Sequence, residues 1–248
     1  MKTLPTPDRC KLSGTALKLI ACTTMLIDHI GASCIETQCA LSAYSSVGLA
    51  RFDLVLRLIG RLAFPIFCFL LTEGFAHTHD VKKYAGRMLL FALVSEVPFD
   101  WAFFGKPFYW GHQNVYWTLL WGILAMSCLA RYQSRKAGAG PKNSVAAAAC
   151  GLGAAGCAMA AEYMNTDYGA IGVLLIILLW LLRESRRKQC IAGGVLFSFE
   201  LTAPLAFVLI WRYSGQRGRC PKWAQWAFYL FYPVHLAVLV MVTNWVIR

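Results

Sequence analysis

Charged side chains are scarce in this sequence, and acidic ones are the scarcest. Only 15% of the 248 residues are charged, with 12 Asp and Glu against 24 Lys and Arg, whereas 58% are hydrophobic. The charges lie between apolar runs of about 20 residues, the length needed to cross the hydrocarbon core of a bilayer. This composition excludes a water-soluble or disordered chain and predicts a multi-span membrane protein.

Two further patterns are missing. The ten cysteines form no C-x-x-C pair and no paired Cys/His spacing, and most lie inside apolar runs. We interpret them as small buried hydrophobic residues and expect neither a metal site nor a disulfide framework. The basic segments lack the interleaved aromatic residues that are typical of single-strand binding, so we expect no nucleic-acid partner.

Apolar segments follow one another with short connections and no visible internal repeat. They predict an all-α polytopic transmembrane helical bundle of about 8–9 spans, with membrane lipids around it. We expect a single integral membrane domain over residues 1–248, in which residues 1–16 are a short basic N-terminus. The expected spans are 17–35, 56–75, 88–104, 115–130, 144–163, 169–182, 190–211 and 224–246.

The distribution of Lys and Arg predicts a cytoplasmic N-terminus, because basic residues precede the first span and gather in alternate connections. The basic segment "WRYSGQRGRCPKW", at 211–223, fits this scheme only if 190–211 is not a full crossing. Gly193, Gly194 and Pro204 favour a broken or re-entrant segment, which returns the basic loop to the cytoplasmic side. A full crossing, with the loop outside, remains the alternative.

An aspartate and a histidine stand side by side in "MLIDHIGA", at 25–32. Counted from Lys18, Asp28 and His29 lie about 15 Å deep, near the midplane of the bilayer, and His235 lies at a similar level in the last span. Ionisable residues at this depth are costly and mark functional sites. Their presence predicts a polar centre built from the first and last spans.

The two adjacent residues point about 100° apart on a helix. His29 shares a face with Lys18, Cys22 and Met25, so we expect His29 to face a cavity. Asp28 then faces a neighbouring helix, where Arg61 is the expected partner. Such an ion pair could serve packing alone, which is the structural alternative for each buried charge taken singly.

More polar residues lie toward the outer half of the bundle. Arg57 and Arg61 are four residues apart, as are Glu96 and Asp100, so each pair is expected to share a helix face. Four more polar residues lie at similar positions near the ends of later spans. With the two pairs they predict a polar lining for an outer cavity: Arg57, Arg61, Glu96, Asp100, His112, Asn114, Asp167 and Tyr168.

Segments in the same order along nearly the whole chain, from residue 18 to about 239, resemble the TraX family of membrane proteins, which includes the F-pilin acetylase. The most specific are "DHIG", "GRLAFPIF" and "FYPVHL"; others are "QNVYWTLLWGIL", "DYGAIGVLL" and "WRYSGQRG". The resemblance implies an acyl-CoA-dependent acetyltransferase of the bacterial inner membrane, related to membrane acyltransferases such as the lysosomal glucosaminide acetyltransferase. The donor would be cytoplasmic acetyl-CoA, with no metal and no haem. The acceptor, a pilin N-terminus, an exported peptide or an envelope glycan, stays open, as does N- against O-acetylation.

The resemblance also gives expected roles. His29 would be the general base or, as an alternative, an acetyl carrier, while Asp28 holds the first span in register. Arg61 would bind CoA or steady the oxyanion, and His235 completes the catalytic centre. The expected donor-binding residues are Arg61, Arg217, Arg219, Lys222, Lys82, Lys83 and Arg87. The expected acceptor-binding residues are Glu96, Asp100, Asn114, Asp167, Tyr168 and Tyr232. "YSGQRG" departs from the family's usual "YNGKRG", which removes one charge from that loop.

Other functions fit parts of the pattern. A transporter, or a nonenzymatic protein of conjugation or pilus assembly, could hold the same polar cavity, although a transporter would be expected to show an inverted repeat. Two histidines on different spans at one level could also be axial ligands of a b-type haem.

Overall fold

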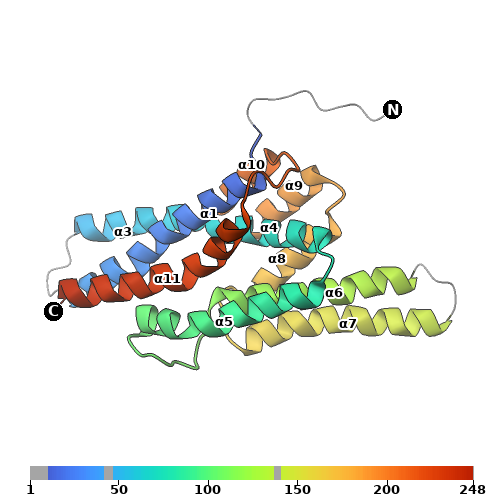
Figure 1. The fold of residues 1–248 in the computed structure, drawn as a ribbon, viewed down its shortest axis with the longest axis horizontal. Helices are drawn as coiled ribbons and strands as arrows, with labels where there is room; N and C mark the ends of the chain where they lie inside the picture. Colours follow the sequence, from blue (N-terminus) through green and yellow to red (C-terminus); the bar gives the residue numbers. More distant parts are fainter. Residues whose placement is uncertain (1–10, 42–46, 137–140, 248) are drawn as a thin grey trace.

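The computed structural model describes residues 11–41, 47–136 and 141–247. Helices joined by turns and loops make up the described residues, with isolated bridges and no strand among them, so the all-helical expectation is confirmed (Figure 1). The elements are α1 (Gly14–His29), the π-helix η1 (Ile30–Ile35), α2 (Glu36–Leu41), α3 (Val47–Gly60), α4 (Ala63–His77), α5 (Val81–Phe104), α6 (Val115–Lys136), α7 (Pro141–Tyr163), α8 (Gly169–Leu181), α9 (Arg186–Leu196), α10 (Leu205–Trp211) and α11 (Lys222–Ile247).

Four helical stretches among the described residues are long and apolar enough to cross a membrane. They are Gly14–Gln38, Val47–His77, Ser144–Tyr163 and Trp223–Trp245, and α8 is a shorter apolar helix. Many large apolar side chains on the outside of the bundle are exposed, as expected of a protein whose surface faces lipid. The fold is that of a helical membrane protein.

The first span changes its hydrogen-bond pattern directly after His29. Ser13 caps α1 by accepting a hydrogen bond from the Ala16 N–H at 3.2 Å, and regular α-helix continues to His29. The next six residues form the π-helix η1, where the Ser33 hydroxyl donates to the His29 carbonyl at 2.7 Å. Gly31 permits close contact with α3, since a Cβ there would lie 2.7 Å from Asp53. Single π-turns are frequent at functional sites, and this one follows the residue expected to act as a base.

Of the two interpretations of 190–211, the structure supports the broken segment and not the full crossing. This segment contains two short helices, α9 and α10, of 11 and 7 residues. Helices of these lengths extend only about 16 and 10 Å, too little to cross the bilayer. Gly193 lets them pack closely, because a Cβ at this position would overlap the Phe207 ring. The segment is a helical hairpin, the broken arrangement that its glycines favour.

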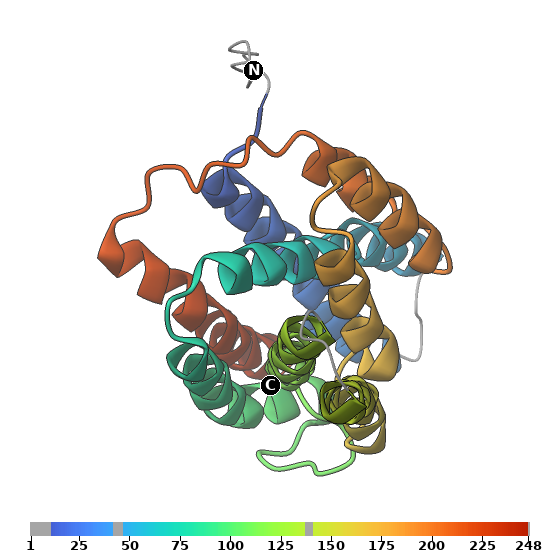
Figure 2. The same ribbon diagram turned by 90° about the vertical axis from the view of Figure 1, so that its right-hand side faces the viewer.

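The basic connection after α10 returns to the beginning of α1. Leu12 donates to the Arg212 carbonyl at 2.8 Å, and Ser214 donates to the Leu12 carbonyl at 2.9 Å. Gly14 and Thr15 donate to the carbonyls of Gln216 and Arg217 in the same way. Figure 2 shows this connection running past the start of α1 to α11. The basic loop therefore lies on the same side as the start of α1, as the re-entrant interpretation predicts.

Candidate functional site

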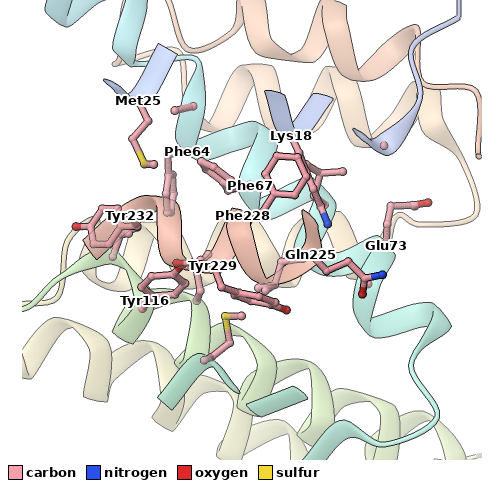
Figure 3. A pocket seen from close by; sticks show the side chains of 18 of the residues that line it. Lys18, Met25, Phe64, Phe67, Glu73, Tyr116, Gln225, Phe228, Tyr229 and Tyr232 are labelled. Atoms are coloured by element: carbon pink, nitrogen blue, oxygen red, sulfur yellow. The ribbon is translucent and has the colours of Figure 1, made fainter. Parts of the chain in front are cut away.

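One cavity of about 610 Å³ lies between α1, α4, α5 and α11 (Figure 3). It extends along α1 from Gly14 to His29, a distance of about 22 Å along the helix axis. Residues near helix ends and in the α10–α11 connection line the entrance: Thr15, Lys18, Glu73, Tyr84, Arg87, Arg217 and Gln225. The deep end is lined from the later turns of α1, the starts of α4 and α6, the α7–α8 connection and the middle of α11: Met25, Asp28, His29, Phe64, Tyr116, Asp167, Tyr168 and Tyr232.

At the deep end, His29 lines the cavity and contacts His235 of the last span, which lies behind it and outside the lining. Nδ1 of His29 and Nε2 of His235 are 2.7 Å apart, and the rings stack with centroids 4.9 Å apart. Nδ1 of His235 lies 2.7 Å from the Phe231 carbonyl, which can only accept a hydrogen bond. In the neutral state His235 therefore carries its proton on Nδ1, and Nε2 accepts from Nδ1–H of His29. This arrangement leaves Nε2 of His29 with a free lone pair, as a general base requires.

The two histidines bind each other directly in this arrangement. Axial haem ligands lie on opposite faces of an iron, with two metal–nitrogen bonds between them, so a pair at hydrogen-bond distance does not have that geometry. Of the four residues expected on one cavity-facing stripe of α1, Lys18, Met25 and His29 line the cavity, whereas Cys22 is buried outside the lining.

Asp28 lies beside His29 on the cavity wall. The prediction that Asp28 pairs with Arg61 is wrong, because its partner is Arg57. Oδ2 of Asp28 lies 2.7 Å from a guanidinium nitrogen of Arg57, which also reaches Glu36 at 3.4 Å. Gly60 on α3 makes room for the pair, since a Cβ at this position would overlap the Asp28 carboxylate. Both adjacent residues therefore line one cavity, which is larger than the spacing argument assumed.

Arg61 lies outside the lining of the large cavity. Helix α3 ends at Gly60, and Arg61 occupies the short turn before α4, so the four-residue spacing does not place it with Arg57. Its guanidinium pairs with Glu200 at 2.9 Å and faces a second cavity of about 400 Å³. Arg61 therefore does not lie in the cavity that His29 lines, and its expected role toward the donor stays a prediction.

The entrance of the large cavity is cationic. Arg217 and Arg87, both expected to bind the donor, line it, and Lys18 lies there with Nζ 5.5 Å from the Phe228 ring centroid. The other expected cations lie elsewhere. The Lys83 side chain is 80% exposed and pairs with Asp80, while Lys82 and Arg219 are exposed outside the lining. Lys222 begins α11, but its side chain lies outside the described part.

The α4–α5 connection explains why Lys83 faces solvent. Asp80 caps α5 by accepting a hydrogen bond from the Lys83 N–H at 3.0 Å. This bond to the charged form holds the pKa of Asp80 below its usual value. Lys83 then turns toward its capping partner and away from the cavity.

Glu96, Asp100 and Asn114 do not line the large cavity, so their predicted place in it is wrong. Glu96 accepts hydrogen bonds from Asn114 and from Trp117 Nε1, the latter at 3.0 Å. Asp100 accepts from the Tyr109 N–H at 2.7 Å. These three residues hold the α5–α6 connection against α5. Of the expected acceptor residues, Asp167, Tyr168 and Tyr232 do line the cavity.

The sequence argument assigned no site role to Glu73, which lines the entrance. Glu73 pairs with Arg186 at 3.4 Å, and Arg186 lies over the Phe69 and Tyr213 rings. This contact joins the end of α4, the start of α9 and the basic connection around the entrance. The only signal in the sequence was an acidic residue near the end of an apolar run. Lys18 was placed on the cavity-facing stripe but without a role toward the donor.

Two comparisons with known proteins find similarity over nearly the whole chain. Residues 13–243 match the family model described as TraX protein. A curated relative, the probable fimbrial assembly protein FimC, serogroup H1, of Dichelobacter nodosus, is 30% identical over 246 residues, which cover 92% of this chain and 94% of the relative. No solved structure matches the chain.

Proposed function

The chain belongs to the TraX family, and on that premise we propose that it is a membrane-embedded acetyltransferase. It takes the acetyl group of acetyl-CoA and transfers it to an amine or hydroxyl of an exported acceptor, such as a pilin, another peptide or an envelope glycan. We propose a role in fimbrial assembly on the ground that the curated relative carries that name. We further propose that the protein lies in the bacterial inner membrane, with the start of α1 facing the cytoplasm in agreement with the basic residues on that side.

The observation that carries this proposal is a single cavity with two chemically different ends. Lys18, Arg87 and Arg217 line the entrance, and His29, hydrogen-bonded to His235 behind it, lines the deep end. The phosphates of CoA match cationic side chains, and its flexible pantetheine arm separates those phosphates from the thioester. Aromatic and apolar residues lie between the two ends, among them Phe67, Leu70 and Phe228.

The tautomers favour one order of proton transfers. The acceptor nitrogen or oxygen attacks the thioester carbonyl carbon while Nε2 of His29 removes the acceptor's proton. The carbon–sulfur bond then breaks, and the CoA thiolate takes that proton from His29, which gives acetylated acceptor and free CoA. His235 keeps Nδ1–H of His29 occupied throughout, so Nε2 is the nitrogen that cycles.

Donor binding can be tested without an identified acceptor, by thermal unfolding of the detergent-purified protein with and without acetyl-CoA. A ligand at about 100 times its Kd that binds only the folded form adds roughly 2.7 kcal/mol to the free energy of unfolding. We expect a saturable rise in melting temperature for the wild type and for His29→Ala, and a loss of that rise in Lys18→Ala. Lys83→Ala is the matched control, because this exposed lysine lies outside the cavity. A folded wild type that no acyl-CoA stabilises would refute the proposal.

A further inference from the structure

The second cavity adjoins the deep end of the first, where the two share lining residues. Asp167 and Tyr168 line both cavities, whereas Arg61, Phe199 and Glu200 line only the second. The segment between α7 and α8 therefore separates the two spaces. Its side chains decide how far any ligand in the large cavity can extend past His29.

The aromatic part of this partition is a stacked pair. The Phe64 and Tyr168 rings lie with centroids 3.7 Å apart and planes within 3° of parallel, and Phe64 is only 3% exposed. Phe64 also contacts Phe197 in the turn of the α9–α10 hairpin, with centroids 5.8 Å apart. Gly172 closes the other side, since a Cβ there would lie 2.8 Å from Phe64 and 2.9 Å from Tyr168.

The backbone of Tyr168 is itself constrained. Its φ of 65° lies in the left-handed region, which is uncommon for a bulky residue and persists only where the surroundings hold it. The stack and Gly172 supply those surroundings on α4 and α8. The partition is therefore a packed wall, with no space between its rings for another group.

We propose that the Phe64–Tyr168 stack sets the length of the acyl chain that the protein accepts, so that short acyl thioesters fit and longer ones are excluded. This inference rests on the proposed function. A thioester at His29, reached from the entrance, directs its acyl chain onward to the wall that Phe64 and Tyr168 form. Each methylene beyond that wall must displace a packed ring or pass toward the Arg61–Glu200 ion pair, and both are unfavourable for an apolar chain.

The test compares acetyl-, butanoyl- and hexanoyl-CoA by competition against labelled acetyl-CoA on the detergent-purified full chain. For the wild type we expect hexanoyl-CoA to bind at least about tenfold more weakly than acetyl-CoA, the effect of overpacking a close-fitting site. Phe64→Ala opens apolar space, and we expect that variant to bind hexanoyl-CoA as tightly as acetyl-CoA or more tightly. Phe64→Leu keeps more of the packing and should shift the ratio in the same direction if Phe64→Ala does not fold.

Phe199→Ala is the matched control. It removes an aromatic ring that is 62% exposed and lines only the second cavity, so the wild-type ratio should persist. If the wild type binds acetyl-CoA but shows no preference for short chains, or if neither Phe64 variant changes the ratio, this inference is overturned while the proposed function stands. A folded wild type that binds none of the three thioesters overturns both.

Discussion

The carboxylate of Asp28 and the guanidinium of Arg57 form an ion pair with an N–O distance of 2.7 Å beside the histidine pair. The pair joins α1 to α3 at the level where α1 becomes a π-helix. Oδ1 of Asp28 is buried and has no hydrogen-bond partner among the described residues. The contact of Oδ2 with Arg57 is therefore the main interaction that stabilises the carboxylate charge. The fold holds His29 in place partly through this neighbour.

Arg57→Gln should therefore destabilise the protein, because it leaves the Asp28 carboxylate unpaired. We expect a loss of about 2–4 kcal/mol, somewhat below the value for a fully buried pair because the two side chains remain 26% and 18% exposed. Thermal unfolding in detergent measures the loss, with the exposed Arg51→Gln on the same helix as control. The double variant with Asp28→Asn should lose less than the sum of the single changes. Strict additivity would argue against the pair.

His235→Leu should slow acetyl transfer without weakening donor binding. The change removes the acceptor for Nδ1–H of His29, so the tautomer with a free Nε2 is no longer favoured. We expect transfer to slow by about 10- to 100-fold, a part of the usual contribution of general base catalysis. The rate of CoA release, measured beside the thermal shift with acetyl-CoA, separates the two effects. His235→Gln can still accept and donate, and it should recover part of the rate; equal rates in all three proteins would exclude this role.

Gly60→Ala should be destabilising although alanine is the better helix former. Its methyl group would overlap the Asp28 carboxylate, and overpacking of this kind costs about 1–3 kcal/mol. Gly86→Ala on α5 is the control, since nothing lies within 4 Å of a Cβ at that position. Unfolding experiments should show a lower melting temperature for the first variant and an unchanged or higher one for the second. Equal effects would contradict the close contact between α1 and α3.

Acidification should weaken the fold in part through His112, in the α5–α6 connection. Burial lowers the pKa of His112, and the opposing charge of Asp100 does not reverse that shift. The unfolded chain then binds the proton more readily than the folded one, so stability falls as the pH drops through about 6.5, the usual histidine value. Melting temperatures between about pH 7.5 and 5.5 should fall more steeply for the wild type than for His112→Gln. Parallel pH profiles would show that this histidine titrates equally in both states.

Hydropathy and helix geometry predicted much of the fold and the location of the deep site. Apolar length located the helices of the main spans, and rise per residue placed His29 and His235 at one level, because both depend only on the local helix. The approach of the two rings to 2.7 Å required the packing of α1 against α11, which no local pattern gives.

Two of the errors come from breaks of regular helix, and a third comes from tertiary packing. The turn at Arg61 separates it from Arg57, and the turn between α9 and α10 converts an apolar run into a hairpin. Glu96 and Asp100 do lie on one helix, as predicted. They contact the α5–α6 connection instead of a cavity because residues 105–114 fold back against that face of α5. Spacing along a sequence predicts a shared face, whereas the neighbour of that face is set by tertiary packing.

The most direct test of the account is acetyl transfer across the membrane itself. Inverted inner-membrane vesicles would carry the wild-type chain or His29→Gln, with acetyl-labelled acetyl-CoA supplied outside, on the former cytoplasmic face. The account predicts release of free CoA and label on an acceptor inside the vesicles with the wild type, and loss of both with His29→Gln at equal protein level. Equal label inside both kinds of vesicle, or none with a wild type shown to be folded, would contradict acetyl transfer by this cavity.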